Sequence, residues 1–198
     1  MGHARPRLLY LRAADEELPD GQLACAAAAG DMWALEELFR RYEPRVVRYL
    51  QRLVRDEEGA DDLFQDASLR AYVNLSSFHP DRSFRAWLYR IATNAGLDWI
   101  RRRRRALPAA QAEGVGPPPE VLVIERDLVR RAEQAMAELS DDHRTVFLLR
   151  HFGQLSYAEI AQIVGSPEGT VRSRMHYAVR ALREKLRYLR EEEGHDDL

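Results

Sequence analysis

Apolar residues recur along most of the chain at intervals of three or four, which is the spacing of one face of an α-helix. The alternating apolar and polar pattern of a β-strand is almost absent. The helical pattern extends from about residue 20 to 105, stops, and returns from about 121 to 193. It therefore predicts an all-α protein made of two small helical domains.

The interruption between the two helical stretches has the composition of a linker. Residues 106–120, ALPAAQAEGVGPPPE, hold four prolines and two glycines, and their only charges are acidic. Proline-rich sequence of this kind is typical of an extended, flexible tether. We therefore expect five segments: an N-terminal tail at 1–19, a domain at 20–105, a linker at 106–125, a second domain at 126–190 and an acidic tail at 191–198.

In the second domain a helical pattern breaks and restarts within residues 157–186, YAEIAQIVGSPEGTVRSRMHYAVRALREKL. Ser156 and Glu159 form the S-x-x-E pattern that caps the start of a helix, and Gly165 is expected to end it. The serine and proline at 166–167 predict the start of the next helix, because proline fits its first position. Two helices joined by a short glycine turn form a helix-turn-helix.

The second of these helices has an apolar face and a basic face. The apolar face holds Val171, Met175, Ala178, Leu182, Leu186 and Leu189, and the basic face holds Arg172, His176, Arg180, Arg183 and Arg187. A merely solvated amphipathic helix would also show a basic stripe. Cap, turn, proline and stripe together favour a recognition helix in the major groove of DNA. Upstream, Ser140 with Asp141 and Asp142 predicts another capped helix, in which the acids are structural.

In the first domain, the segment 59–75, GADDLFQDASLRAYVNL, predicts an amphipathic helix. Its buried stripe is formed by Leu63, Phe64, Ala67 and Ala71. Polar and acidic residues occupy the neighbouring face: Asp62, Gln65 and Asp66, with Leu69. Taken alone, such a face need only keep the helix soluble.

The segment 77–105 combines aromatic residues with arginines. A proline-broken loop precedes a helix from about Ser83, which ends in five consecutive arginines. Rings and arginines together suit single-stranded nucleic acid, although most helix-spaced rings are expected in the core. Phe78 lies in the loop, where a ring is less expected in the core, and Asn94 interrupts the apolar face of the helix. In the helical stretch before it, Pro44 is expected to kink or restart the helix.

Both domains resemble one family. The quoted helix-turn-helix, preceded by AMAELSDDHRTVFLLRHF, closely resembles region four of extracytoplasmic-function sigma factors. The first domain resembles region two, because Asp62 and Gln65 match its D-x-x-Q-E-x-F pattern and Asp66 replaces the glutamate. Ser68 and Tyr177 depart from the family, which usually has an apolar and a basic residue at those positions. The resemblance covers about residues 20–190.

The resemblance implies a sigma initiation factor, which binds core RNA polymerase, recognises promoter DNA and promotes its melting. It implies contact with the clamp helices of the largest polymerase subunit through Asp62, Leu63, Gln65, Asp66 and Leu69. It implies binding and melting of the minus-ten element, as duplex and single strand, through Phe78, Arg82, Ile91, Asn94, Arg101 and Arg102. It implies binding of the minus-thirty-five duplex through Thr170, Arg172, Ser173, Arg174, His176, Tyr177 and Arg180. Region four also touches the flap of the second-largest subunit in this family, and an anti-sigma factor is an implied partner.

The composition narrows the other possibilities. Thirty basic and thirty-two acidic residues give a net charge of −2, which excludes a protein that coats DNA by general positive charge. Cys25 is the only cysteine, so no internal disulfide and no cysteine-based metal site is possible, in keeping with a reducing cytoplasm. We expect neither a signal peptide nor a membrane span.

The sequence is also compared with two other classes of protein, an enzyme and a helix-turn-helix regulator. An enzyme is disfavoured, because GSPEGT lacks the lysine and the preceding strand of a phosphate loop, and His143 and His151 lack a zinc spacing. We expect no catalytic activity, no cofactor and no metal. A helix-turn-helix regulator that acts without polymerase would explain residues 140–190, but it leaves the features of the first domain unexplained.

Overall fold

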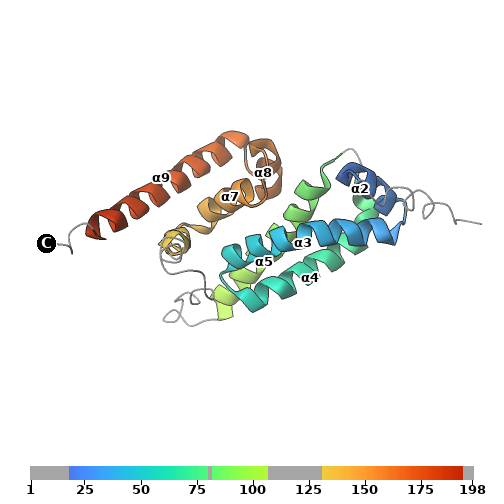
Figure 1. Cartoon of the computed structure of the whole chain (residues 1–198), viewed down its shortest axis with the longest axis horizontal. Coiled ribbons are helices and arrows are strands. Elements are labelled where there is room, and N and C mark those ends of the chain that lie inside the picture. Colours follow the sequence, from blue (N-terminus) through green and yellow to red (C-terminus); the bar gives the residue numbers. More distant parts are fainter. Residues whose placement is uncertain (1–17, 80–81, 107–130, 194–198) are drawn as a thin grey trace, which may run out of the picture.

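The computed structural model describes residues 18–79, 82–106 and 131–193, without the side chains of residues 76 and 188–193. All regular structure in these residues is helical, which confirms the all-α prediction (Figure 1). The elements are α2 (Asp20–Ala28), α3 (Met32–Val54), α4 (Glu57–Val73), the 3-10 helix η1 (Leu75–Ser77), α5 (Phe84–Ala106), α7 (Asp141–His151), α8 (Tyr157–Val164) and α9 (Glu168–Glu193). Residues 131–137 are also helical. Most of the expected linker and of both tails lies outside the described residues.

Two helices of the first domain, α3 and α4, start at aspartate caps. The carboxylate of Asp31 accepts hydrogen bonds from the backbone amides of Trp33 and Ala34, at 3.0 and 3.3 Å, and so begins α3. The carboxylate of Asp56 accepts from the amide of Gly59 at 2.9 Å and begins α4. These caps fix where the two antiparallel helices start.

Of the two effects expected at Pro44, a kink or a restart, the restart is wrong, because α3 is one helix that continues through this residue. Proline inside a helix costs about 3 kcal/mol. Buried side chains lie on both sides of it, including Leu38, Tyr42, Val46 and Tyr49, so that packing on either side holds the two halves in one helix.

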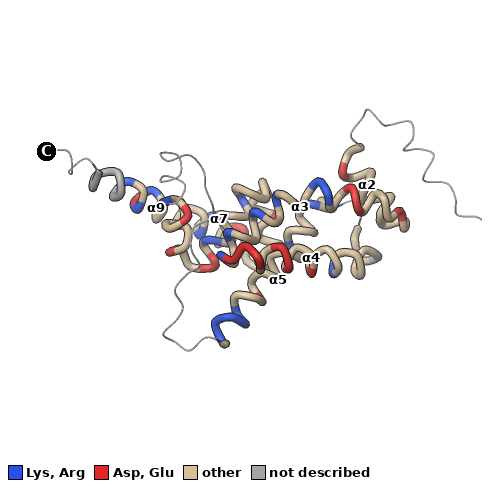
Figure 2. Tube along the Cα trace, turned by 60° about the horizontal axis from the view of Figure 1, so that its bottom comes forward, with Lys and Arg blue, Asp and Glu red and all other residues tan. Residues whose placement is uncertain are grey.

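Helices α3, α4 and α5 pack together as the core of the first domain. α5 passes close to α3 at Gly96, where an added Cβ would lie only 2.8 Å from Cδ2 of Leu53. The small residue therefore permits the close helix contact. Beyond this contact α5 continues into its run of arginines, which forms a positive tip on the helix (Figure 2).

The second domain has the predicted helix-turn-helix. Ser156 and Glu159 form the capping box of α8, and Gly165 ends α8 in the left-handed conformation with φ of 63°. The following helix, α9, begins at Glu168, one residue later than expected from Pro167. Ser140 caps α7 by accepting from the amide of His143.

The apolar stripe of α9 is confirmed over most of its predicted length. Val171, Met175, Ala178 and Leu182 are buried, and Leu186 is half-buried. The side chain of Leu189 lies outside the described residues. The stripe packs on α7 and α8, so the basic face of α9 points outward.

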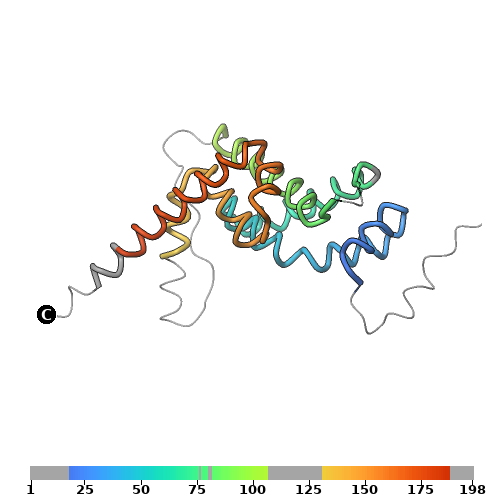
Figure 3. Tube along the Cα trace, turned by 90° about the horizontal axis from the view of Figure 1, so that it is seen from above, coloured from blue at the N-terminus to red at the C-terminus, as the bar shows by residue number. Residues whose placement is uncertain are grey.

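The two domains are in contact. α7 packs on α3, and α8 packs on α5 (Figure 3). Burial raises the pKa of the Tyr89 phenol to about 12, and this phenol donates to the carbonyl of Phe152 at 3.2 Å. The guanidinium of Arg52 lies 4.7 Å from the ring centroid of Phe152. The apolar core is continuous across this contact.

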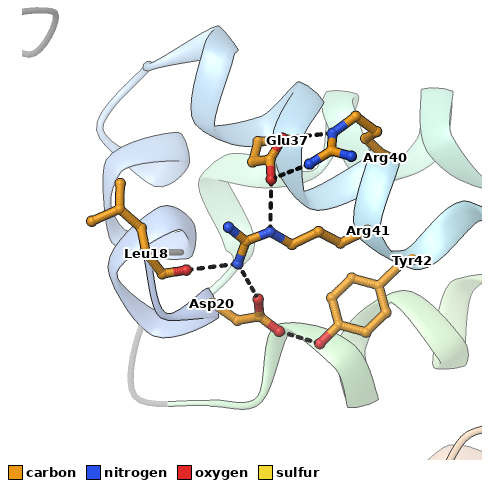
Figure 4. Close-up of polar contacts among 6 residues, drawn as sticks. All are labelled: Leu18, Asp20, Glu37, Arg40, Arg41 and Tyr42. Carbon is orange, nitrogen blue, oxygen red and sulfur yellow. Dashed lines mark hydrogen bonds and ion pairs between the residues drawn. The ribbon is translucent and has the colours of Figure 1, made fainter. Parts of the chain in front are cut away.

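A polar network joins α2 to α3 (Figure 4). Nη1 of Arg41 donates to the carbonyl of Leu18 at 2.6 Å and to the carboxylate of Asp20 at 3.1 Å. The Tyr42 hydroxyl donates to the other oxygen of Asp20. Burial, and then the Asp20 carboxylate, raise the pKa of Tyr42, so the phenol stays protonated as a donor.

The centre of this network is the half-buried carboxylate of Glu37. It accepts from Arg40 at 2.7 and 2.8 Å and from Nε of Arg41 at 2.8 Å. These hydrogen bonds, from Arg40 first and then Arg41, lower the pKa of Glu37 from 4.5 to about 2. The carboxylate thus orients the arginine that holds α2.

We predict that Glu37→Gln makes the stability of the protein less sensitive to acid. A carboxyl whose pKa is lower in the folded protein stabilises it above the unfolded pKa of 4.5, and this contribution is lost as the pH falls towards 2. The variant should lose about 1–3 kcal/mol of unfolding free energy at pH 7 and less at pH 3. Urea unfolding at both pH values measures this difference. Glu36→Gln removes a charge from an exposed neighbour and should leave the unfolding free energy unchanged at both pH values. An equal effect of the two substitutions would contradict the prediction.

Candidate functional site

The outer face of α4 is one of three candidate surfaces. Asp62, Gln65 and Leu69 are exposed on it, as the sequence predicts. Asp66 is half-buried and forms an ion pair with Arg70 at 2.7 Å. Leu63, which was expected among the contact residues, is only 5% exposed. Its place in that set is corrected, because its side chain belongs to the core beneath the face.

Two apolar residues beside this face were not predicted from the sequence. Tyr72 and Val73 are 52% and 74% exposed near the end of α4, next to Leu69 at 65%. Apolar side chains that stay in water are characteristic of interaction surfaces. The signal in the sequence was their position outside the buried stripe that ends in Ala71.

The ring of Phe78 lies in the core and not, as its place in a loop predicts, outside it. It is 4% exposed, with its ring centroid 5.8 Å from that of Phe84 and 5.2 Å from that of Trp87. The expectation of a ring outside the core is therefore wrong. The 3-10 turn after Leu75 brings the ring back against the first turn of α5, where it completes an aromatic cluster.

Asn94 is exposed on α5, and its side-chain amide makes no hydrogen bond within the described parts of the chain. This excludes, among those residues, a role as a cap or a bridge to buried backbone. Arg82 is also exposed, two residues before the helix begins, whereas Ile91 is half-buried between the core and the surface. The side-chain amide of Asn94 therefore has a donor and an acceptor that are free among the described residues.

The arginines at the end of α5 have different surroundings. Arg101 pairs with Asp98 at 2.7 Å, and Arg102 is exposed. Arg103 pairs with the cap residue Asp56 at 2.7 Å. Arg104 pairs at 2.8 Å with an aspartate of α7 in the second domain. Only the first two of these four therefore face away from the rest of the protein.

The exposed face of α9 is the third candidate surface. It brings together most of the residues expected to contact duplex DNA: Thr170, Arg172, Ser173, His176, Tyr177 and Arg180, all exposed. Arg174 differs, because it is half-buried and its guanidinium pairs with Asp142 and donates to the hydroxyl of Ser166 at 3.2 Å. Arg174 joins α7 to the turn, and its placement on the outer face is corrected.

Other kinds of site find no support in the described parts of the chain. No cluster of histidine, cysteine and acidic side chains that could hold a metal ion is found in residues 18–79, 82–106 and 131–193. None of the helices described there is long and apolar enough to cross a membrane.

A helix-turn-helix with an exposed basic face, joined to a second all-α domain, is typical of DNA-binding transcription proteins. Two families match its domains: Sigma-70 region 2 over residues 38–106 and Sigma-70 region 4 over residues 130–182. The second match covers α8 and the first part of α9, and the first covers most of the domain that a free-standing regulator would not explain.

Similar proteins carry the same assignment. The ECF RNA polymerase sigma factor SigW of Bacillus subtilis is 35% identical over 173 residues, covering 81% of this chain and 92% of that protein. The ECF RNA polymerase sigma-E factor of Escherichia coli is 32% identical over 187 residues, covering 88% and 97%. The structure of CnrH in complex with the cytosolic domain of CnrY matches with a TM-score of 0.64 at 28% identity, covering 87% of this chain and 97% of that one. The chain belongs to the ECF family of RNA polymerase sigma factors, and it is a transcription initiation factor.

We predict that Phe78→Ala lowers the unfolding free energy by about 3–5 kcal/mol, because it removes a buried ring that packs on Phe84 and Trp87. Asn94→Ala, on the same domain but exposed, should change it by no more than about 0.5 kcal/mol. Chemical denaturation of the two variants beside the parent protein measures both. A Phe78→Ala protein as stable as the parent would show that the ring contributes little to the core.

Proposed function

We propose that this sigma factor binds core RNA polymerase through the outer face of α4. The observation that carries the assignment is the division of this helix into two sets of side chains. Leu63 and Phe64 hold it in the core, and Asp62 and Gln65 face solvent beside the exposed Leu69. An acidic and polar patch with an apolar neighbour suits a basic helical partner, as the clamp helices of the largest subunit are in the family.

Co-purification with core polymerase tests this assignment. We predict that Asp62→Arg combined with Gln65→Ala weakens polymerase binding about tenfold or more, because it reverses a charge at the centre of the patch. Both side chains are exposed, so the fold should be retained. Glu43→Arg is the matched control, since it makes the same reversal from an acidic to a basic side chain at an exposed position on another helix, α3. Unchanged co-purification of the correctly folded double variant would exclude this face as the polymerase contact.

We also propose that the face of α9 binds the minus-thirty-five duplex, with Arg172 on a base edge. Arg172, His176 and Arg180 are exposed along one side, and Arg172 lies in the second turn of the helix. The N-terminal part of a recognition helix is the part that reaches base edges. The flap of the second-largest subunit is the proposed polymerase contact of this domain.

For the minus-ten element, we propose that Asn94 reads an unpaired base and that Phe78 supports the site from the core. The exposed amide can pair with a base edge. The buried Phe78 ring would have to leave its cluster before a base could stack on it. Arg82, Arg101 and Arg102 are exposed and can follow the phosphates, with the half-buried Ile91 beside Asn94.

We predict that Asn94→Ala reduces formation of the open promoter complex without loss of thermal stability. On a promoter already mismatched across the minus-ten element, the bases are unpaired before the protein binds, so unpairing no longer limits opening. The reduction in open complex should nevertheless persist there, because recognition of the base that Asn94 reads is still lost. Permanganate footprinting on both promoters, beside a thermal melt, measures this. Normal opening and unchanged sequence preference would remove Asn94 from the recognition site.

The remaining partners follow from the family. CnrH is solved with the cytosolic domain of a second protein, CnrY. We propose that this chain also binds a protein partner, an anti-sigma factor that restrains it, and that it acts in the cytoplasm. Its action is binding and opening of DNA, whereas the chemistry of transcription belongs to the polymerase.

A further inference from the structure

Arg172 is held by two side chains from different elements. Glu168 lies one turn earlier on α9, and its Oε1 accepts from Nε and Nη2 of Arg172 at 3.1 and 2.5 Å. Tyr157, the first residue of α8, lies beneath the guanidinium, with its ring centroid 4.9 Å from Cζ. One contact holds the guanidinium by its edge and the other by its face.

The hydrogen bonds to Glu168 occupy the side edge of the guanidinium. The other edge, with both hydrogens of Nη1 and one of Nη2, has no partner in the part of the chain that the structure describes. This end-on pair of donors has the geometry that binds O6 and N7 of guanine in the major groove. The side chain of Arg172 is 62% exposed, so this edge is open to a ligand.

The ring of Tyr157 is itself anchored independently of any DNA. It is half-buried and packs on the core. A second arginine, Arg150, lies 5.2 Å from the ring centroid, and its Nη1 donates to the carbonyl of Leu155 at 2.7 Å. Because Arg150 is tied to the backbone, the ring lies in a fixed environment when Arg172 rests on it.

The cost of ordering an arginine explains why this matters for base recognition. A free arginine side chain loses about 2 kcal/mol of rotamer freedom when it is fixed in one geometry. A freely moving guanidinium can bind a phosphate in many orientations, but a base edge accepts only one. Holding the side chain before binding removes part of that cost for the base contact.

We propose that Tyr157 and Glu168 are positioning residues that fix Arg172 for contact with a base edge, a guanine by its acceptor pair, and not with a backbone phosphate. The proposal rests on the proposed function of α9 as the duplex-binding face. Tyr157 lies on the helix before the recognition helix, so the specificity of α9 depends on a residue outside it.

The chain contains a matched control for Glu168. Arg180 forms the same kind of ion pair one turn apart on α9, with Glu184 at 2.8 Å. Within the described residues no aromatic ring lies against Arg180. Glu184→Gln and Glu168→Gln therefore remove the same charge from the same helix, but only Glu168→Gln releases a guanidinium that also rests on a ring.

The test measures base preference with the full chain bound to core polymerase. Holoenzymes select from promoter fragments randomised across the minus-thirty-five element, and the bound fragments are sequenced. Arg172→Ala should reduce the preference for one base pair by about 5- to 150-fold, the range of a bidentate contact. Tyr157→Leu and Glu168→Gln should each reduce preference at that same base pair by about 3- to 10-fold, a part of that loss. Tyr157→Phe, which keeps the ring, should retain the preference for this base pair. Glu184→Gln should leave this preference unchanged.

The outcomes separate the proposal from the function on which it rests. If Arg172→Ala weakens all sequences equally, Arg172 contacts only phosphate, and both the base contact and its positioning are overturned. If Arg172→Ala lowers preference at one base pair but Tyr157→Leu and Glu168→Gln do no more than Glu184→Gln, only the positioning is overturned. If Tyr157→Leu fails to fold in a thermal melt, Glu168→Gln alone decides, because Glu168 lies near the surface.

Discussion

The burial of one helix, α3, is the constraint on which the rest of the structure depends. Helices α2, α4 and α5 pack on it, and α7 reaches it from the second domain. At its centre the hydroxyl of Thr93 donates to the carbonyl of Tyr89 at 2.6 Å. The hydroxyl of the fully buried Tyr49 therefore donates to Thr93, at 2.9 Å. An unpaired hydroxyl at this depth would be costly, so the pair also fixes the register of α3 against α5.

The acidic first turn of α7 shows how a chain of net charge −2 accommodates segments rich in arginine. Asp141 pairs with Arg144 of its own helix and with Arg104 at the end of α5, while Asp142 pairs with Arg174 of α9. Arg104 is 67% exposed, and an ion pair so exposed contributes no more than about 1 kcal/mol. The apolar contact, and not these charges, therefore accounts for most of the attraction between the domains. Asp141 and Asp142 mainly determine which arginines are paired within the protein and which remain exposed to solvent.

Features that depend on neighbours in sequence could be predicted, and features that depend on distant contacts could not. The capping box of Ser156 and the left-handed Gly165 are local, and both were found from the sequence. The burial of Phe78 and the inward turn of Arg174 depend on partners from other parts of the chain. The spacing of apolar residues within one helix does not report such partners. The packing of the two domains likewise involves segments separated by a long linker. The contact of Tyr157 with Arg172 belongs to the same class, since it joins two helices across the turn.

The candidate surfaces follow from the cores beneath them. On α4 the buried Leu63 and Phe64 fix the orientation of the helix, so that Asp62 and Gln65 face solvent. On α5 the buried Ala92, Thr93 and Ala95 fix the helix so that the intervening Asn94 faces solvent. A side chain that reads a base must be held in place without being used up in internal bonds. Asn94 meets this condition through the rigidity of its helix, and Arg172 meets it through a ring and a carboxylate that occupy only its face and one edge.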